Sequence, residues 1–503
     1  METIVLTGKD LTISELVAVA RENAKVEISA EAKERLVSAR QLVFDLVDAD
    51  YPIYGFNVGV GWNKDKKVFK EFFQKYNCNL IRSHCIGVPP YANEEETRAV
   101  MLARLNTMLT GCTGLSLEIP QMYADMLNAG IHPLIPERGS VGEGDIGLLS
   151  HIGLAIIGEG DVIYQGKKMP SAEAFEIADL KPVALGPKDG LAIVSSNALG
   201  AGQAAIALHE LEEFLDIAEV IYAASLEGLE GNVSPLDDRN HALRRYKGQR
   251  AVAKRLRGLL EGSYLHDPNP ERPLQDPLCY RDVPQLHGAV WEMLAYAKER
   301  LEIQLNTTDD NPCLLLEERH ISPSANFDPI NWVLAVEALS AGLSHISKAS
   351  CLRMIKLGNP AFTRLSRFLS PADDVICFGT IQKTPVALDA EIRQLCTPCS
   401  MDCMPLAGDM EDISTNSPLV AQNLRKIIDN LRYIFAIELM HAAQAVDLRK
   451  TKKLGKGTKP LFAEVRKRVS FYETDRNITA DIVTLRNMIA DGSLRKIAAV
   501  EKA

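Results

Sequence analysis

The 503-residue chain carries a net charge of −10, which argues against nucleic-acid binding, because a phosphate-binding surface needs clustered Lys and Arg. The sequence contains no run of about 18 uncharged apolar residues and no basic segment followed by an apolar core near its start, so we expect neither a membrane span nor a secretion signal. The apolar content of 46% and ten cysteines predict a cytoplasmic globular protein with reduced thiols.

The first expected element is a short strand at residues 3–6, followed by a turn at 7–10. Beyond residue 30 the helical period dominates, and four stretches are long enough for helices well above the usual globular length: 199–229, 284–305, 330–355 and 414–447. In the last stretch, apolar residues recur at the spacing of one helix face, at Leu424, Ile427, Ile428, Leu431, Ile434 and Phe435. Ser417 and Pro418 supply a cap and first-turn pair.

Four long helices predict a mainly α fold with a central helix bundle. We expect a mixed, mostly helical part over residues 1–198 and a long-helix part over 199–503, together forming one compact unit. The first long helix carries more small apolar residues than one bundle can bury, namely Ala201, Ala204, Ala205, Ala207, Ala223 and Ala224. This excess indicates a helical homo-oligomer.

Four glycines crowd the stretch from Gly139 to Gly147, just before an apolar segment that ends at Ile157. Gly142, Gly144 and Gly147 match the dinucleotide-binding pattern by letter, but that pattern has meaning only after a strand inside a strand–helix–strand unit, which this region lacks. A phosphate-binding loop fails as well, because no Gly-Lys-Ser/Thr follows. From these residues alone, a tight loop that leads into a buried helix remains an open interpretation.

Further motifs occur in the order found in a known family. They are PIYGFNVGVG (52–61), RSHCIGVPP (82–90), LQDPLCYR (274–281), TTDDNP (307–312), ANF (325–327) and GDMEDIS (408–414). With the glycine-rich loop, they make the chain resemble the histidine and aromatic amino-acid ammonia-lyase family over nearly its whole length. The resemblance implies the mainly α fold of the fumarase- and aspartase-like superfamily, a small-molecule substrate, and a homotetramer whose sites combine loops from several subunits.

The glycine-rich loop departs from the family. Members carry an Ala-Ser-Gly triad after Gly-Ser-Val-Gly, and the triad cyclises into an electrophilic methylideneimidazolone group. Here Gly142 is followed by Glu143, Gly144 and Asp145, one residue short and without the alanine or the serine. Because dehydration of a serine cannot make the ring from Glu-Gly, we predict that the protein has no such group and no other cofactor.

Elimination without the electrophile needs a substrate whose nitrogen already leaves well, and a trimethylammonium group departs as neutral trimethylamine. Ser83, His84 and Glu411 match the positions that contact imidazole in histidine-specific members. The chain therefore resembles the branch of the family that lacks the triad and eliminates trimethylamine from ergothioneine, a thio-histidine betaine, to give thiourocanate. Glu411 is expected to belong to the catalytic set.

Tyr54 matches the family's catalytic tyrosine and is the expected base at Cβ, with help from cationic neighbours, since its ordinary pKa lies near 10. The alternative is a packed loop aromatic. Arg281 matches the arginine that holds the substrate carboxylate. The two-pronged donor geometry of a guanidinium suits this contact. Gln275 matches a polar site residue. The family's second tyrosine falls on Leu278, so a proton relay through that position is lost.

Five further residues carry weaker predictions. Lys383 is expected to stabilise negative charge on a thione-bearing ring, with an exposed helix-start lysine as the alternative. Asn197 is expected to contact substrate, within a register uncertainty of two residues. Phe327 is expected to line the site, although it would equally suit the core. Glu143 and Asp145 occupy the place of the electrophile and are expected to face the leaving trimethylammonium group.

Two other functions stay open from the sequence: elimination from another substrate, such as histidine betaine, and a catalytically silent homologue that serves as a binding subunit. The chain retains Tyr54 as a base, Arg281 as a carboxylate contact and Glu411 as a ring acceptor, which argues against a catalytically silent protein. Metal binding at Cys396, Cys399 and Cys403 is not expected, because no second Cys-x-x-Cys pair completes a four-ligand site.

Overall fold

The computed structural model describes residues 3–48, 52–68, 72–450 and 453–498. The chain divides into two compact units, each built from three segments. Unit 1 comprises 1–209, 297–336 and 398–422, and unit 2 comprises 210–296, 337–397 and 423–503. The first segment of unit 1 ends close to the boundary expected at residue 198, but two later segments also belong to this unit because the long helices carry residues of both.

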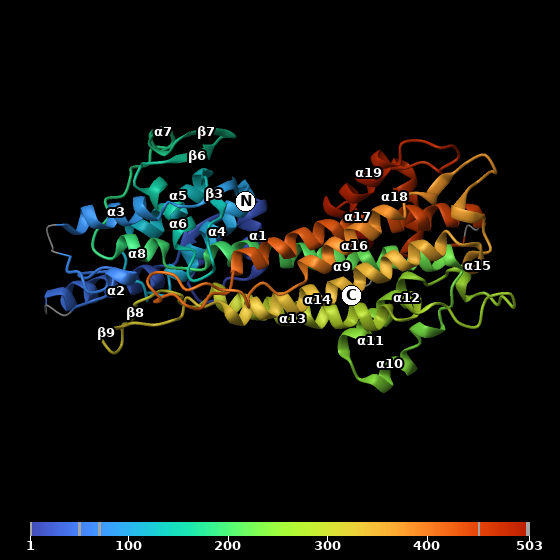
Figure 1. The fold of residues 1–503 in the computed structure, drawn as a ribbon, viewed down its shortest axis with the longest axis horizontal. Helices are drawn as coiled ribbons and strands as arrows, with labels where there is room; N and C mark the ends of the chain where they lie inside the picture. Colours follow the sequence, from blue (N-terminus) through green and yellow to red (C-terminus); the bar gives the residue numbers. More distant parts are fainter. Residues whose placement is uncertain (1–2, 49–51, 69–71, 451–452, 499–503) are drawn as a thin grey trace. The chain divides into compact units, whose positions relative to one another are not determined.

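The four long helices lie where the sequence predicts them (Figure 1). They are α9 (Ala198–Leu229), α13 (Val283–Leu305), α14 (Ile330–Leu357) and α17 (Ser417–Arg449). The six apolar residues expected on one face of α17 are all fully buried. Periodic burial of one apolar stripe stabilises a helix of this length more than intrinsic propensity does. The expected mainly α fold is confirmed.

Unit 1 holds short helices and four small sheets, and the predicted strand at residues 3–6 is β1, paired in parallel with β2. The other sheets pair β3 with β5, β8 with β9, and β6 with both β4 and β7. Its elements are β1 (Thr3–Leu6), α1 (Ile13–Arg21), β2 (Lys25–Ile28), α2 (Ala30–Asp48), α3 (Phe73–His84), β3 (Val88–Tyr91), α4 (Glu94–Met108), α5 (Glu118–Ala129), β4 (Ile131–Pro133), β5 (Pro136–Arg138), α6 (Ile146–Ile156), β6 (Asp161–Tyr164), β7 (Lys167–Pro170), α7 (Ser171–Ile177), α8 (Asp189–Val194), β8 (Cys313–Leu315) and β9 (His320–Ser322).

Unit 2 has no strand among its described residues. Besides its parts of the long helices, it contains α10 (Asp238–Arg244), α11 (Lys247–Leu259), α12 (Leu278–Arg281), α15 (Pro360–Thr363), α16 (Lys383–Leu395), α18 (Thr458–Arg468), α19 (Ile478–Ala490) and α20 (Arg495–Ala498). Its core contains a fully buried ion pair between Arg353 and Glu438, in which Arg353 Nη2 lies 2.7 Å from Glu438 Oε2.

One helical stretch, Asp189–Leu229, is long and apolar enough to cross a membrane by length and composition, although the sequence pattern predicted no span. Its most apolar window is wholly buried inside the described structure. Complete burial of apolar side chains is the environment of a core helix in a globular protein.

Candidate active site

The glycine-rich loop needs bare backbone because it packs tightly against the segment that precedes α17. Gly142 has a φ of +83°, and a Cβ added there would lie 2.6 Å from the Ser417 nitrogen. Only glycine tolerates both the left-handed backbone and such an approach without strain. The Asn416 N–H also donates to the Val141 carbonyl at 2.7 Å. The loop is therefore anchored to the segment that carries Glu411.

Asn197 connects the glycine-rich loop to the loop of Phe327. Its Oδ1 accepts a hydrogen bond from the Gly144 N–H at 3.0 Å, and its Nδ2 donates to the Phe327 carbonyl. Asn197 is fully buried, whereas Phe327 is half-buried. The structure thus brings together the glycine-rich loop and the ANF motif, with Asn197 between them. Asn197 acts in it as a connector between two loops.

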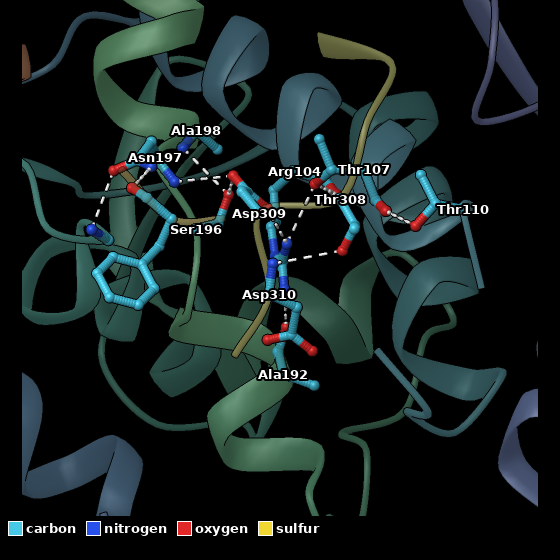
Figure 2. A network of polar contacts seen from close by, with 12 residues as sticks. Arg104, Thr107, Thr110, Ala192, Ser196, Asn197, Ala198, Thr308, Asp309 and Asp310 are labelled. Atoms are coloured by element: carbon cyan, nitrogen blue, oxygen red, sulfur yellow. Dashed lines mark hydrogen bonds and ion pairs between the residues drawn. The ribbon is translucent and has the colours of Figure 1, made fainter. Parts of the chain in front are cut away.

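Asp309 holds Ser196 and Asn197 through hydrogen bonds, a role that the sequence did not predict (Figure 2). Its Oδ2 accepts from the Asn197 N–H at 2.9 Å and from the Ser196 hydroxyl at 2.7 Å. Arg104 lies 3.2 Å from its other oxygen, and both members of this ion pair are buried. Burial raises the pKa of Asp309, while the charge of Arg104 lowers it. The two consecutive aspartates of the TTDDNP motif are the sequence feature that could have indicated this role.

Asp145 does not face an open space, which corrects the expectation that it contacts a leaving group. Its carboxylate is fully buried and accepts hydrogen bonds from the Ser140 hydroxyl at 2.7 Å and from the N–H groups of Leu199 and Gly200 at 3.1 and 3.2 Å. Those amides belong to the first turn of α9, where N–H groups lack helical partners. Burial raises the pKa of Asp145 to about 6, and these hydrogen bonds oppose the rise. Asp145 caps α9.

Glu143 is the half-buried acid of the loop, and its carboxylate lies among others of the same charge. Burial raises its pKa to about 7, and the charges of Glu411, Asp328 and Asp412 add to the rise. Like charges disfavour ionisation of a neighbour, so the four acids together create a strongly negative region. A permanent cation is the natural ligand of such a region.

Tyr54 lies beside the predicted ring acceptor. Its Oη accepts a hydrogen bond from the Gly61 N–H at 2.7 Å, and a Cβ added at Gly61 would lie 3.8 Å from Glu411 Oε1. Burial raises the pKa of Tyr54, the Gly61 hydrogen bond lowers it, and the Glu411 charge raises it. The charged neighbour is thus anionic, contrary to the cationic neighbours expected. Tyr76, which the sequence did not single out, interacts with Tyr54 as well.

His84 is the last residue of α3, and its ring is fixed by its own helix. Nδ1 lies 2.7 Å from the Leu80 carbonyl and 3.2 Å from the Ser83 hydroxyl. A ring nitrogen this close to a carbonyl oxygen must donate, so in the neutral ring Nε2 is the acceptor. The His84 carbonyl lies against Gly147 at the start of α6, where an added Cβ would be 3.5 Å away. His84 therefore belongs to the surroundings of the glycine-rich loop.

Gln275 and Arg281 belong to unit 2, where both line a polar pocket of about 380 Å³ together with Arg244, His241 and Asp276. Arg281 ends α12, and its Nε is buried without a hydrogen-bond partner among the described residues. Lys383, the first residue of α16, is exposed and does not line this pocket. Leu278, at the position of the family's second tyrosine, is exposed as well.

Helix α12 is held by a buried network that the sequence did not reveal. Arg353 Nη1 donates to the Cys279 carbonyl at 3.2 Å, and the Tyr222 hydroxyl donates to the Tyr280 carbonyl at 2.7 Å. Glu438 completes the network by pairing with Arg353. Removal of one partner from a buried ion pair of this kind destabilises the protein, because the other charge stays buried without compensation. The network fixes the turn that presents Arg281.

The described residues contain no group of three or more His, Cys, Asp or Glu side chains placed to hold a metal ion. The residues of the loop also do not fit the family's prosthetic group. Only Glu143 and Gly144 separate Gly142 from Asp145, and the N–H groups of Gly144 and Asp145 already donate, the latter to the Ser196 carbonyl at 2.5 Å. We therefore assign no step to such a group.

The long-helix fold and the loops assembled in unit 1 define a carbon–nitrogen lyase of the ammonia-lyase type. The profile of the aromatic amino acid lyase family matches residues 11–467. The chain belongs to this family, as its motifs predicted.

Similar proteins include enzymes with two different names. The solved structure of ergothionase from Treponema denticola, in complex with desmethyl-ergothioneine sulfonic acid, matches with a TM-score of 0.95 at 50% identity, over 98% of this chain and 99% of that one. Histidine ammonia-lyase from Trypanosoma cruzi matches with a TM-score of 0.91 at 29% identity, over 99% and 95% of the two chains. A histidine ammonia-lyase of Treponema denticola is 36% identical over 98% of this chain and 97% of its own length.

Proposed function

We propose that this lyase eliminates trimethylamine from ergothioneine to give thiourocanate, without a built-in electrophile. The observation that carries the proposal is Glu143, which stands where the family has its triad and lies among the charges of Glu411, Asp328 and Asp412. This negative region suits a quaternary ammonium group, which stays cationic at every pH. The 50% identity to an ergothionase supports the same substrate.

The proposed reaction is a base-assisted β-elimination. The oxygen of Tyr54 removes a proton from Cβ, the electrons of that C–H bond form the double bond, and the C–N bond breaks as trimethylamine leaves with its bonding pair. Burial and Glu411 raise the pKa of Tyr54, so the free enzyme holds a protonated phenol at neutral pH. The cation of the bound substrate supplies the positive charge that favours the phenolate, and the Gly61 N–H supports the oxygen.

The other proposed contacts follow the chemistry of the substrate. His84 and Glu411 contact the imidazole-type ring, and Asn197 and Phe327 shape the site around it. Arg281, with Gln275, holds the carboxylate through its two-pronged guanidinium. Lys383 stabilises negative charge that develops on the thione-bearing ring, because a charge placed in advance needs no rearrangement during the reaction. Glu143 contacts the trimethylammonium group.

We propose in addition that the enzyme is a cytoplasmic homotetramer whose sites combine loops from several subunits. Shared sites predict that activity falls when the protein is diluted below the concentration at which it assembles. Turnover measured across a dilution series, with the oligomeric state followed by light scattering, tests this. Unchanged specific activity in a monomeric preparation contradicts it.

The proposed reaction is tested with the purified protein and three substrates. With ergothioneine we expect the ultraviolet absorption of thiourocanate and an equal amount of trimethylamine, and with L-histidine neither urocanate nor ammonia. Histidine betaine, which lacks the sulfur, is the matched control substrate. Equal turnover of histidine betaine would mean that the enzyme does not require the thione. Urocanate and ammonia from L-histidine contradict the interpretation of the Glu143 loop, and no turnover of any of the three favours a silent homologue.

A further inference from the structure

Two thiols lie side by side in unit 1, behind the loops of the candidate site. Cys112 follows α4, and Cys313 begins β8. The Leu314 N–H donates to the Cys112 carbonyl at 2.8 Å, which aligns the two backbones as neighbours. The two thiols also lie close enough for each to shift the pKa of the other. Cys112 is half-buried and Cys313 buried, so a small reagent reaches the pair from the Cys112 side.

The surroundings make one sulfur the donor and the other the acceptor. The hydrogen bond from Cys313 lowers the pKa of Cys112, with further help from the hydroxyls of Thr110 and Thr308, while burial and the charge of Asp310 oppose this effect. The same contact and burial raise the pKa of Cys313. Because the thiolate is the reactive form of cysteine, the half-buried Cys112 is the nucleophile of the pair.

The pair is connected to the candidate site through the segment between Thr308 and Cys313. The Thr308 hydroxyl interacts with Cys112 and accepts from the Asp310 N–H at 3.3 Å, and the next residue, Asp309, forms the ion pair with Arg104. Asp309 in turn accepts from the Asn197 N–H at 2.9 Å.

A second connection leaves the same segment towards the loop of Phe327. The Ser324 N–H donates to Asn311 Oδ1 at 3.0 Å, and the Ser324 hydroxyl donates to the Asp310 carbonyl at 3.0 Å. Both loops that meet at Asn197 are thus attached to the segment that ends in Cys313.

We propose that Cys112 and Cys313 are an oxidative modification site, at which hydrogen peroxide closes an intramolecular disulfide that displaces the Thr308–Cys313 segment and loosens Asn197 and the glycine-rich loop. The slowing of turnover that follows rests on the proposed function, whereas the disulfide and the loosening do not. A disulfide fixes the geometry of its two side chains more tightly than a thiol pair does, and in the proposal the Thr308–Cys313 segment shifts to meet that geometry. Small displacements of positioning groups reduce enzymatic rates strongly.

The chemistry balances with peroxide as the oxidant. The Cys112 thiolate attacks one oxygen of hydrogen peroxide and breaks the O–O bond, which gives a sulfenic acid and hydroxide. The Cys313 sulfur then attacks the Cys112 sulfur, the S–OH bond breaks, and hydroxide leaves; two waters form once the thiol protons are counted. Two thiols lose two electrons, and one peroxide gains them. A dithiol reductant reverses the change.

The test treats the full-length protein with hydrogen peroxide and maps the alkylated peptides by mass spectrometry without reduction. We expect a linkage between the peptides of Cys112 and Cys313, which Cys112→Ser and Cys313→Ser both abolish and Cys78→Ser, a half-buried thiol of the same unit, leaves in place. Thermal unfolding of each reduced variant confirms that it is folded. Absence of the linkage, at peroxide levels that oxidise other cysteines, overturns the modification site.

Two readouts then test the coupling. Amide hydrogen exchange at Asn197 and Gly144 should be faster in the oxidised protein, and this readout needs no substrate. Turnover of ergothioneine should fall about tenfold to a hundredfold and return on reduction. A linkage with unchanged exchange overturns the coupling. A reduced protein that turns over no ergothioneine refutes the proposed function alone, and faster exchange then still supports the modification site.

Discussion

The two units position their candidate residues with similar buried ion pairs, but the predicted site residues of the two units differ in charge. In unit 1 the pair of Arg104 and Asp309 holds Asn197, and the side chains around the glycine-rich loop are acidic. In unit 2 the pair of Arg353 and Glu438 holds α12, and its predicted site residues are Gln275, Arg281 and Lys383. In the proposed reaction, the acids of unit 1 contact the ammonium group, and the cations of unit 2 contact the carboxylate and the electron-rich ring.

In both units the candidate residues lie on loops or helix ends, and a buried ion pair fixes the backbone there. A buried pair contributes little net stability compared with apolar residues, but removal of one partner is costly. Both pairs hold carbonyl or N–H groups of loops and helix ends through hydrogen bonds. Their function is therefore positional, and variants of each unit should show different signatures.

The largest expected effect is on turnover. Tyr54→Phe should lower kcat for ergothioneine about 10²- to 10⁴-fold, because it removes the proposed base while keeping the ring. Steady-state kinetics measure this, with circular dichroism as a check on folding. Tyr76→Phe is the matched variant, since Tyr76 interacts with Tyr54. Full activity in Tyr54→Phe, with loss in Tyr76→Phe, transfers the role of base to Tyr76.

A second effect compares the ion pairs directly. Arg353→Ala and Arg104→Ala should each lower the free energy of unfolding by about 3–5 kcal/mol, because each leaves a carboxylate buried and unpaired. Urea denaturation measures the loss. Removal of both partners, as in Arg353→Met with Glu438→Leu, should restore much of it. A single substitution that costs less than about 1 kcal/mol would mean that water reaches the pair.

The pocket of unit 2 is tested by a smaller change in binding. Arg281→Lys should raise KM about tenfold to a hundredfold with less effect on kcat, since lysine keeps the charge but loses the two-pronged contact with a carboxylate. Arg244→Lys is the matched control, because Arg244 lines the same pocket. If only the Arg244 variant raises KM, the carboxylate contact belongs to Arg244.

The smallest effect concerns pH. The folded protein keeps a proton on Glu143 up to about pH 7, above the ordinary value of 4.5, so this group's contribution to stability is full below that ordinary value and is lost as the pH rises through 7. Glu143→Gln should therefore be more stable than the parent in alkaline buffer. A cationic substrate prefers ionised Glu143, so KM should fall as the pH passes 7.

Denaturation and KM measured across this pH range check both expectations, and Glu176→Gln, an exposed acid of unit 1, serves as control. The KM change should be absent in Glu143→Gln. Its persistence in that variant would assign the titration to another group, such as one of the neighbouring acids.

The long helices could be predicted from the sequence because periodic burial is a local pattern, and all four begin and end within a few residues of their expected bounds. The short strands β2 to β9 were not predicted. Some pair with distant segments, as β3 does with β5, and the strands of the β6–β7 and β8–β9 hairpins have only three or four residues each, too few for a clear alternating pattern. Motifs singled out Tyr54 and Glu143 as expected site residues, and Asn197 was expected within a register uncertain by two residues. They missed Arg104 and Arg353, whose roles depend on carboxylates far along the chain. The role of Asp145 was wrong for the same reason, because the amides that it caps belong to α9.

The anchoring of the glycine-rich loop has a consequence for engineering. The Val141 carbonyl on one side and the Gly144 N–H with the Asp145 carboxylate on the other tie the loop to its surroundings, and Glu143 lies between these ties. The length of the segment between these ties and the residue types in it can change while the hydrogen bonds at both ends stay in place. Insertion of a residue there is thus the place to graft a different reactive group while the rest of the scaffold keeps its form.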